Sequence, residues 1–242
     1  MAAHPVPPLS DSDSTVAARG GKGLVCLVDD DADIRASLSA LLDLLGYQVA
    51  TFADPVAFLR QKPIGGPAVV LLDVRLPTMS GVSLRDHLVE NGVAHPIVFM
   101  SGECAAQEIV DAMKGGAVDF LLKPFTREDL EAALGTAMQQ AREQARTERD
   151  RTSFAAGLAM LSPREHDVLT LMLKGYQNRQ ISEKLSIQAD TVKKYRAAIC
   201  GKFAVEDTVG LIELAEASGA RGPLNAPAPL PIADAAAAEH GG

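Results

Sequence analysis

The sequence predicts an α/β domain built on a parallel sheet, followed through a long helix by a smaller all-helical domain. Three observations predict this arrangement. Short apolar runs alternate with amphipathic stretches through the first half of the chain. A charged, helix-favouring stretch follows, and from Leu161 onward the pattern indicates short helices only. A length of 242 residues is enough for two ordinary domains, each with its own core.

The first domain is predicted to consist of five strands with helices between them. The strands are expected at the apolar runs LVCLV, QVATF, AVVLLD, PIVFMS and AVDFLL. The first helix carries apolar residues at helical spacing, namely Ile34, Leu38, Leu41, Leu42 and Leu45. Gly46 closes it, Asp54 and Pro55 open a short second helix, and further helices are expected over residues 80–90 and 106–114. This alternation favours a parallel sheet that is covered on both faces.

A long helix is predicted to leave the first domain. Thr126 can cap it, with Asp129 three residues on, and polar residues continue the helical pattern through residue 151. The charged end has no sustained apolar heptad, so it indicates a connector rather than a strong coiled coil.

The second domain is predicted to consist of short helices. Ser162 and Glu165 form a capping box with proline at the first helical position, and Gly175 stops that helix. Its buried face is expected to hold the apolar residues Val168, Leu169, Met172 and Leu173. A helix over residues 178–185, a tight turn and a basic helix over residues 191–203 follow, which is the helix-turn-helix arrangement.

Composition limits the class of protein. A hydrophobic content of 47% with 22% charged residues is typical of a globular chain, and no apolar run reaches the roughly 20 residues that cross a bilayer. The first residues have neither the basic start nor the apolar core of a secretory signal, so we expect a cytoplasmic protein without a membrane partner. The two ends, residues 1–21 and 218–242, are rich in Pro, Ser, Ala and Gly and are expected to be disordered.

Charge is distributed unevenly along the chain. The net charge is −8, yet the stretch from Thr191 to Lys202 carries four basic residues and no acidic one. Three widely spaced cysteines and five histidines without ligand spacing favour neither a disulfide framework nor a zinc site. Opposite charges on separate segments suggest that the two domains do different work.

Side chains able to perform chemistry follow four of the predicted strands. These are Asp29 and Asp30, Asp73, Ser101 and Lys123. In open parallel sheets, ligands bind beyond the carboxyl ends of the strands, so these side chains converge if their strands are neighbours.

Such a set predicts phosphoryl chemistry. Carboxylates from two strands, with water, suit Mg²⁺, and Ser101 and Lys123 can hold phosphoryl oxygens. With Asp73 as the nucleophile, the product is an aspartyl phosphate. For Asp31 and Asp33 the sequence favours a simpler role, which is to cap the following helix and to stabilise its dipole.

The motifs LVDDD, LLDVRLPTMSG, FMSGE and AVDFLLKPF resemble the successive signatures of the receiver domain of two-component response regulators. The resemblance implies a flavodoxin-like fold with a five-stranded parallel sheet in the order 2-1-3-4-5. It also implies that a histidine kinase phosphorylates Asp73, with Ser101 and Lys123 holding the phosphoryl oxygens. The implied Mg²⁺ ligands are Asp29, Asp30, Asp73 and the main-chain carbonyl of Arg75, with Asp29 acting mostly through water.

The same resemblance assigns further roles. Phe120 matches an aromatic switch that turns inward as Ser101 moves toward the phosphate, although the sequence equally allows an ordinary core phenylalanine. The Lys123-Pro124 peptide is expected to be cis. From their opposite charges on adjacent loops, we also hypothesise that Arg75 and Glu103 pair over the phosphorylation site, the alternative being two solvated surface charges.

The stretch LSPREHDVLTLMLKGYQNRQISEKLSIQADTVKKYRAAICGKF is similar to the LuxR-type helix-turn-helix, and its pairing with a receiver is that of the NarL/FixJ class. On a helical wheel, Val192, Ile199 and Phe203 share one face, while a basic face lies opposite. The expected DNA contacts are Lys193, Lys194, Arg196 and Ala197. Gln188 stands where a better helix cap is usual, and Gly201 lies inside the helix, so DNA affinity is expected to be modest until two copies bind together.

The predicted organisation has five parts: the tail 1–21, the receiver core 22–126, its last helix with a helical linker 127–153, the DNA-binding domain 154–217 and the tail 218–242. The predicted function is a transcription regulator, not an enzyme, whose phosphorylation promotes dimerisation and promoter binding. The expected partners are a sensor kinase, duplex promoter DNA and a second copy, with RNA polymerase as a further candidate. A magnesium-dependent phosphohydrolase and a pure interaction module stay open as rivals.

Overall fold

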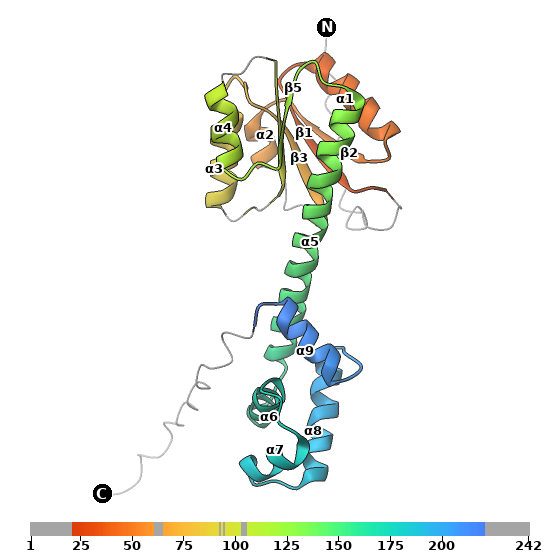
Figure 1. Ribbon diagram of the computed structural model, residues 1–242, viewed down its shortest axis with the longest axis vertical. Coiled ribbons are helices and arrows are strands. Elements are labelled where there is room, and N and C mark those ends of the chain that lie inside the picture. Colours follow the sequence, from red (N-terminus) through yellow and green to blue (C-terminus); the bar gives the residue numbers. More distant parts are fainter. Residues whose placement is uncertain (1–20, 61–64, 92, 94, 103–105, 221–242) are drawn as a thin grey trace, which may run out of the picture. The chain divides into compact units, whose positions relative to one another are not determined.

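The structure is a computed structural model that describes residues 21–60, 65–91, 93, 95–102 and 106–220. Its elements follow in the order β1 (Leu24–Val28), α1 (Ala32–Leu44), β2 (Gln48–Phe52), α2 (Pro55–Leu59), β3 (Ala68–Asp73), α3 (Gly81–Glu90), β4 (Ile97–Ser101), α4 (Ala106–Lys114), β5 (Asp119–Leu122), α5 (Arg127–Ala159), α6 (Pro163–Leu173), α7 (Asn178–Leu185), α8 (Ala189–Lys202) and α9 (Thr208–Ala217) (Figure 1). The chain divides into two compact units, Met1–Arg146 and Thr147–Gly242.

The predicted tails fall mostly outside the described residues. Residues 1–20 and 221–242 are not among them. The described end of the second tail begins at Ser218, and Ala220 packs into the core of the second unit with 9% of its surface exposed.

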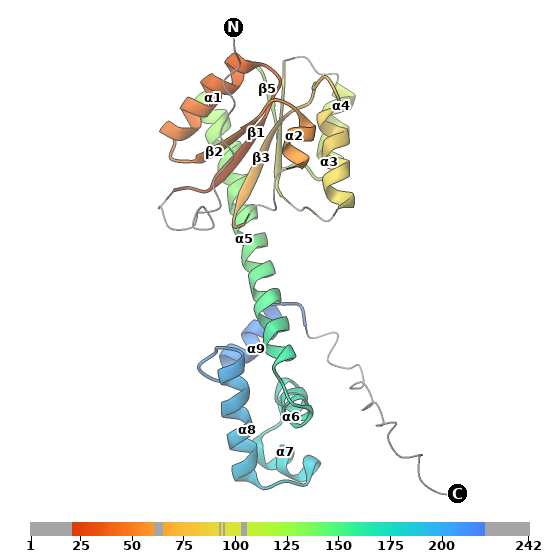
Figure 2. The same ribbon diagram turned by 180° about the vertical axis from the view of Figure 1, so that it is seen from behind.

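The first unit holds a five-stranded parallel sheet in the order β2-β1-β3-β4-β5, which confirms the predicted topology (Figure 2). Every residue of β3 and β4 is buried. These strands therefore read as continuous apolar runs, as expected for a sheet that is covered on both sides.

Two apolar cores cover the two faces of the sheet. One face packs against α1 and the first half of α5, and the other against α2, α3 and α4 (Figure 1). From α1, its C-terminal cap and α5, the first core contains Leu38, Leu42, Leu45, Leu130, Ala133, Leu134, Ala137, Met138 and Ala141. The second core includes Phe58, Leu84, Leu88 and Ala112. The carboxyl edge of the sheet is left for polar side chains.

Local signals in the sequence set the helix ends. Asp54 and Ser80 accept backbone hydrogen bonds at the starts of α2 and α3, and Thr126 exchanges hydrogen bonds with Asp129 at the start of α5. Gly46 ends α1 with a φ of 86°, a conformation that favours glycine.

Helix α5 extends further than the predicted linker. It runs without interruption from Arg127 to Ala159, and its last turns belong to the second unit, where Phe154 is buried. The helix therefore contributes to the apolar cores of both units.

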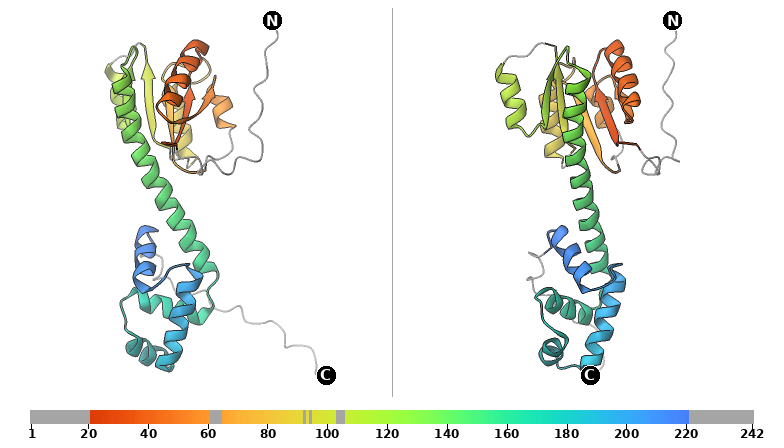
Figure 3. Two further views of the ribbon diagram at one scale, coloured as in Figure 1. Left: turned by 90° about the vertical axis from the view of Figure 1, so that its right-hand side faces the viewer. Right: turned by 45° about the vertical axis from the view of Figure 1, so that its right-hand side comes forward.

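The second unit packs α6, α7, α8 and α9 around one core (Figure 3). The predicted capping box of Ser162 and Glu165 is present, and Gly175 follows α6 with a φ of 82°. Helix α8 begins at Ala189, two residues before the predicted start. Gln188, which was predicted to be a poor cap, stands at the N-cap position and makes no side-chain hydrogen bond there.

Two of the three cysteines lie in the described ranges. Cys26 and Cys200 are free and buried, and burial raises the pKa of the Cys26 thiol to about 12, so it stays protonated and unreactive. Within the same ranges, no helix combines the length and the apolar character that a bilayer crossing requires.

Candidate functional site

The carboxyl edge of the sheet brings the predicted acidic and basic side chains together. Asp29 follows β1, and Asp73 ends the neighbouring strand β3. Ser101 ends β4 and is fully buried, and its carbonyl accepts a hydrogen bond from the backbone of Lys123, 2.8 Å away. The order of the strands therefore places these four residues, distant in the chain, at one edge.

Lys123 links the two buried carboxylates. Its Nζ donates to Asp29 Oδ2 at 2.7 Å and to Asp73 Oδ2 at 2.5 Å. Burial acts to lower the pKa of Lys123, but the hydrogen bonds and charges of the two aspartates outweigh it and raise that pKa. The ammonium group is therefore charged and offsets the repulsion between the carboxylates.

Asp73 is held by both of its oxygens. Its Oδ1 accepts from the backbone N–H of Arg75 at 2.8 Å, while Oδ2 binds Lys123. Burial raises the pKa of Asp73, although the hydrogen bonds from Lys123 and Arg75 act to lower it. The bonds from Lys123 and Arg75 therefore favour the ionised form of Asp73 against the effect of burial.

Gly81 lets α3 begin close to Asp73. A Cβ atom at this position would overlap the carbonyl oxygen of Asp73, and the Gly81 N–H donates to the Val74 carbonyl at 2.9 Å. A side chain at this point would displace the strand end that carries Asp73.

The four acids of the LVDDD motif and its extension have separate surroundings. Asp29 is 1% exposed and accepts from the Asp31 N–H at 2.9 Å, whereas Asp30 is exposed. Asp31 caps α1 by accepting from the N–H groups of Asp33 and Ile34, and Asp33 lies in the first turn. The predicted cap at Asp31 is confirmed, and Asp33 lies in the first turn, where a carboxylate stabilises the helix dipole.

The donor set fits a hard divalent cation. Asp29 and Asp73 supply buried carboxylate oxygens, and Asp30 adjoins them from the solvent side. Within the described ranges no three acidic, histidine or cysteine side chains converge into a preformed cage, so water would complete the coordination, as Mg²⁺ prefers.

Three predictions concern the edge around Ser101. Phe120 is partly buried, with its ring centroid 6.4 Å from that of Phe99, which is compatible with a switch and with an ordinary core residue. The proposed partner of Arg75, Glu103, lies outside the described residues. The Lys123-Pro124 peptide is cis, as predicted.

In the second unit, α7 and α8 form the predicted helix-turn-helix. Ser186 takes a left-handed conformation between them, and Ser182 Oγ donates to the Ile187 carbonyl at 2.7 Å. Val192 and Ile199 are fully buried, whereas Lys193 is exposed. Lys194 and Ala197 share that exposed face, as predicted.

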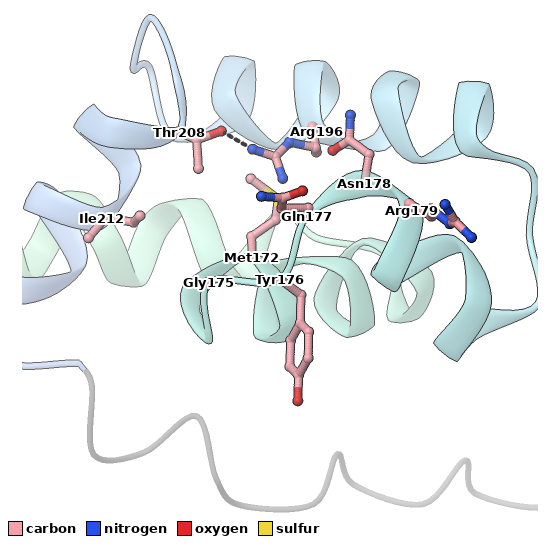
Figure 4. A pocket seen from close by; sticks show the side chains of 9 residues that line it. All are labelled: Met172, Gly175, Tyr176, Gln177, Asn178, Arg179, Arg196, Thr208 and Ile212. Carbon is pink, nitrogen blue, oxygen red and sulfur yellow. Dashed lines mark hydrogen bonds between the residues drawn. The ribbon is translucent and has the colours of Figure 1, made fainter.

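Arg196 points to a different side of α8. It is partly buried, and its Nη2 donates to Thr208 Oγ1, at the first residue of α9, over 2.7 Å (Figure 4). Both residues line an open pocket of about 490 Å³ whose wall also contains Met172, Gly175, Tyr176, Gln177, Asn178, Arg179 and Ile212. The sequence did not indicate this pocket. Arg196 and Thr208 are 12 positions apart on two different helices, and a contact of this kind leaves no periodic pattern in the sequence.

Lys202, at the end of α8, forms hydrogen bonds with residues at and just before the start of α6. Its Nζ donates to Glu165 Oε2 at 2.7 Å and to the Met160 carbonyl at 3.0 Å. The hydrogen bonds from Lys202 and then from Ser162 lower the pKa of Glu165 from 4.5 to about 2. This ionised carboxylate fixes one end of the helix that carries the exposed lysines.

Glu165→Gln is expected to lower the free energy of unfolding of the second unit by about 1–3 kcal/mol at neutral pH, because a charged hydrogen bond is lost. The pKa is lower in the folded state, so the contribution is complete above about 4.5 and falls as the pH drops toward 2. Urea unfolding at pH 7 and pH 3 measures this difference. Glu213→Gln, at an exposed site on α9, is the control. An equal difference at both pH values would contradict the assignment.

Comparison with known proteins matches both units. A model described as "Response regulator receiver domain" matches residues 25–135, and one described as "Bacterial regulatory proteins, luxR family" matches residues 159–215. The chain is 37% identical to the transcriptional regulatory protein FixJ of Bradyrhizobium diazoefficiens, over 82% of this chain and 97% of that one. It is 34% identical to the response regulator protein TodT of Pseudomonas putida, over 80% and 85%.

A solved structure agrees with these sequence matches. The response regulator StyR superposes with a TM-score of 0.69 at 34% identity, over 80% of this chain and 98% of that one. The similarity therefore extends through both units and the helix α5 between their cores.

Proposed function

The chain belongs to the two-component response regulators of the NarL/FixJ class, and from this premise we propose that phosphorylation of Asp73 promotes dimerisation and binding to promoter DNA. Members of this family regulate transcription and are not enzymes. A cognate histidine kinase and duplex DNA are the partners that the family implies. We propose that the protein works in the cytoplasm, where it would meet both partners.

The chemistry proposed for the first unit is phosphoryl transfer. A carboxylate oxygen of Asp73 forms a P–O bond as the P–N bond of the kinase's phosphohistidine breaks, and the imidazole leaves with the electron pair. Lys123, already bonded to Asp73, and Ser101 hold the phosphoryl oxygens. Mg²⁺ bound by Asp29, Asp30, Asp73 and the carbonyl of Arg75 would supply further positive charge for the transferred group.

We propose that the change is relayed through Ser101 and Phe120 to the surface formed by α4 and β5. Apolar side chains are exposed on both elements: Val110 and Met113 at 42% each, and Leu122 at 53%. Exposed apolar side chains on adjacent elements support a contact with a second copy.

Dimerisation would present two α8 helices to DNA. We propose that Lys193 and Lys194 reach base edges or phosphates in the major groove, that the small Ala197 permits close approach, and that Arg196 contacts a flanking phosphate. Half-sites are then expected about 34 Å apart or at a multiple of this spacing. RNA polymerase is the partner that a promoter-bound regulator would meet next.

The observation that carries this proposal is the bonding of Lys123 to both Asp29 and Asp73 at the carboxyl edge of the sheet. Genome-wide footprinting of the wild type beside Asp73→Ala tests it. Promoter sites that are occupied by the wild type and lost in the variant are expected. Equal occupancy in the two strains would contradict the control by phosphorylation. An absence of sites in both would favour a module that binds other proteins.

Lys193→Ala and Lys194→Ala are each expected to weaken binding to a target duplex about tenfold and to lower the salt dependence by about one released ion where a phosphate contact is lost. Fluorescence anisotropy across a series of salt concentrations measures both quantities. Lys174→Ala removes an exposed lysine after α6 and serves as the control. An effect of Lys174→Ala equal to that of the α8 variants would show that only net charge matters.

A further inference from the structure

Five residues form a continuous exposed stripe along α8. Each lies three or four positions from another member, so together they occupy one face of the helix. All are exposed: Asp190, Lys193, Lys194, Ala197 and Gly201. We call them the α8 stripe. The opposite face carries Val192 and Ile199 into the core.

Asp190 is the acidic member of this otherwise basic and neutral stripe. It lies in the first turn of α8 with 82% of its side chain exposed, and its Oδ1 accepts from Lys193 Nζ at 3.1 Å. The lysine side chain is itself 66% exposed. An ion pair this exposed contributes little to folding stability, and a carboxylate in the first turn stabilises the helix dipole by about 0.3–1 kcal/mol. Neither small contribution depends on the face of the helix that carries the acid, so neither explains its position on the exposed stripe.

A carboxylate on this surface also weakens nonspecific electrostatic binding to DNA. It repels phosphates and reduces the positive charge that Lys193 offers them. In the major groove, however, the exocyclic amino groups of cytosine and adenine are hydrogen-bond donors that a carboxylate can accept from. Recognition helices contact base edges with their N-terminal residues, which is where Asp190 lies.

We infer that Asp190 determines sequence specificity by accepting a hydrogen bond from the N4 amino group of a cytosine, while Lys193 donates to a neighbouring guanine. This inference rests on the proposed DNA-binding function. The Asp190–Lys193 ion pair shows that both side chains reach the same point at the start of α8, where they could contact adjacent bases. Ala197 has a small side chain and Gly201 has none, so this part of the helix can approach the bases closely.

The test is selection of bound sequences from a randomised duplex pool by the full-length, phosphorylated protein. The wild type is expected to prefer cytosine at one position of each half-site by about 5- to 100-fold. In Asp190→Ala that preference falls below about threefold, while the preferences at other positions remain. Asp190→Asn shifts the same position toward adenine, because an amide can pair with both N6 and N7 of that base.

A matched control removes an equivalent ion pair from another helix. Asp167 pairs with Arg164 at 3.8 Å, also three positions apart in the first turns of α6. Asp167→Ala is expected to leave the selected sequence unchanged. Asp190→Ala is further expected to bind random duplex about two- to fivefold more tightly than the wild type, because a charge that repels phosphates is gone.

The outcomes separate this inference from the function on which it rests. An Asp190→Ala protein that selects the wild-type sequence, with every base preference intact, overturns the role of Asp190 and leaves the DNA-binding proposal standing. A uniform weakening at all positions also overturns it, because that pattern reports a less stable helix and not a lost base contact. A wild type that selects no sequence overturns the proposed function and this inference together.

Discussion

Asp73→Asn is expected to abolish phosphorylation and, with it, the stimulation of dimerisation and DNA binding. The amide keeps the shape of the carboxylate but is a far poorer nucleophile toward phosphorus, so no acyl phosphate forms. Lys123 also donates to Asp29 at 2.7 Å, and this hydrogen bond is expected to remain in the variant. The sheet edge therefore retains a charge partner, and the loss of function does not require unfolding.

Intact-protein mass spectrometry after treatment with acetyl phosphate and Mg²⁺ measures this effect. The wild type is expected to gain the mass of one phosphoryl group, and Asp73→Asn to gain none. Asp33→Asn changes an exposed carboxylate in the first turn of α1 and is expected to behave as the wild type. Phosphoryl mass on the Asp73→Asn protein would place the acceptor elsewhere and contradict the proposed mechanism.

The convergence of the site could be predicted from the sequence because it follows from topology. Asp29, Asp73, Ser101 and Lys123 each stand where a strand ends, and parallel strands end at the same edge. The strands themselves were visible as apolar runs bounded by turn residues. Only the ends and the order of the strands were needed, not the conformations of the side chains.

Contacts made by long side chains could not be predicted in the same way. Arg85 is buried, and its Nη1 donates to the carbonyls of Asp111 and Ala112 in the last turns of α4, at 3.3 and 3.1 Å. Its guanidinium fills the space beside Gly115, where a Cβ atom would overlap it. No pattern in the sequence indicates this contact, because a flexible arginine can reach many partners and the packed helices determine which one it contacts.

The far end of α5 was equally hard to predict. Residues between the two cores are polar and favour a helix, so periodicity does not indicate where the helix stops. Tertiary contacts determine how far the helix extends: Phe154, Gly157 and Leu158 face the core of the second unit. The predicted linker and the observed helix therefore differ at the point where packing replaces local preference.

Phe154→Ala is expected to have the largest effect on stability. Phe154 is 2% exposed, and its ring centroid lies 5.1 Å from that of Phe203, the residue that ends α8. Removing a buried ring leaves a cavity and costs about 3–5 kcal/mol of unfolding free energy. The second unit would then unfold readily, and DNA binding would fail although every exposed residue of α8 is intact.

Hydrogen exchange measured by mass spectrometry resolves the two units and therefore tests this directly. In Phe154→Ala, peptides from α6 to α9 are expected to lose protection, while peptides from β1, β3 and β4 keep it and Asp73 still accepts a phosphoryl group. Phe154→Leu retains most of the buried volume and should recover most of the stability. Loss of protection in the sheet as well would show that the two cores unfold together. The last turns of α5 would then couple the stability of the acceptor site to that of the DNA-binding helices.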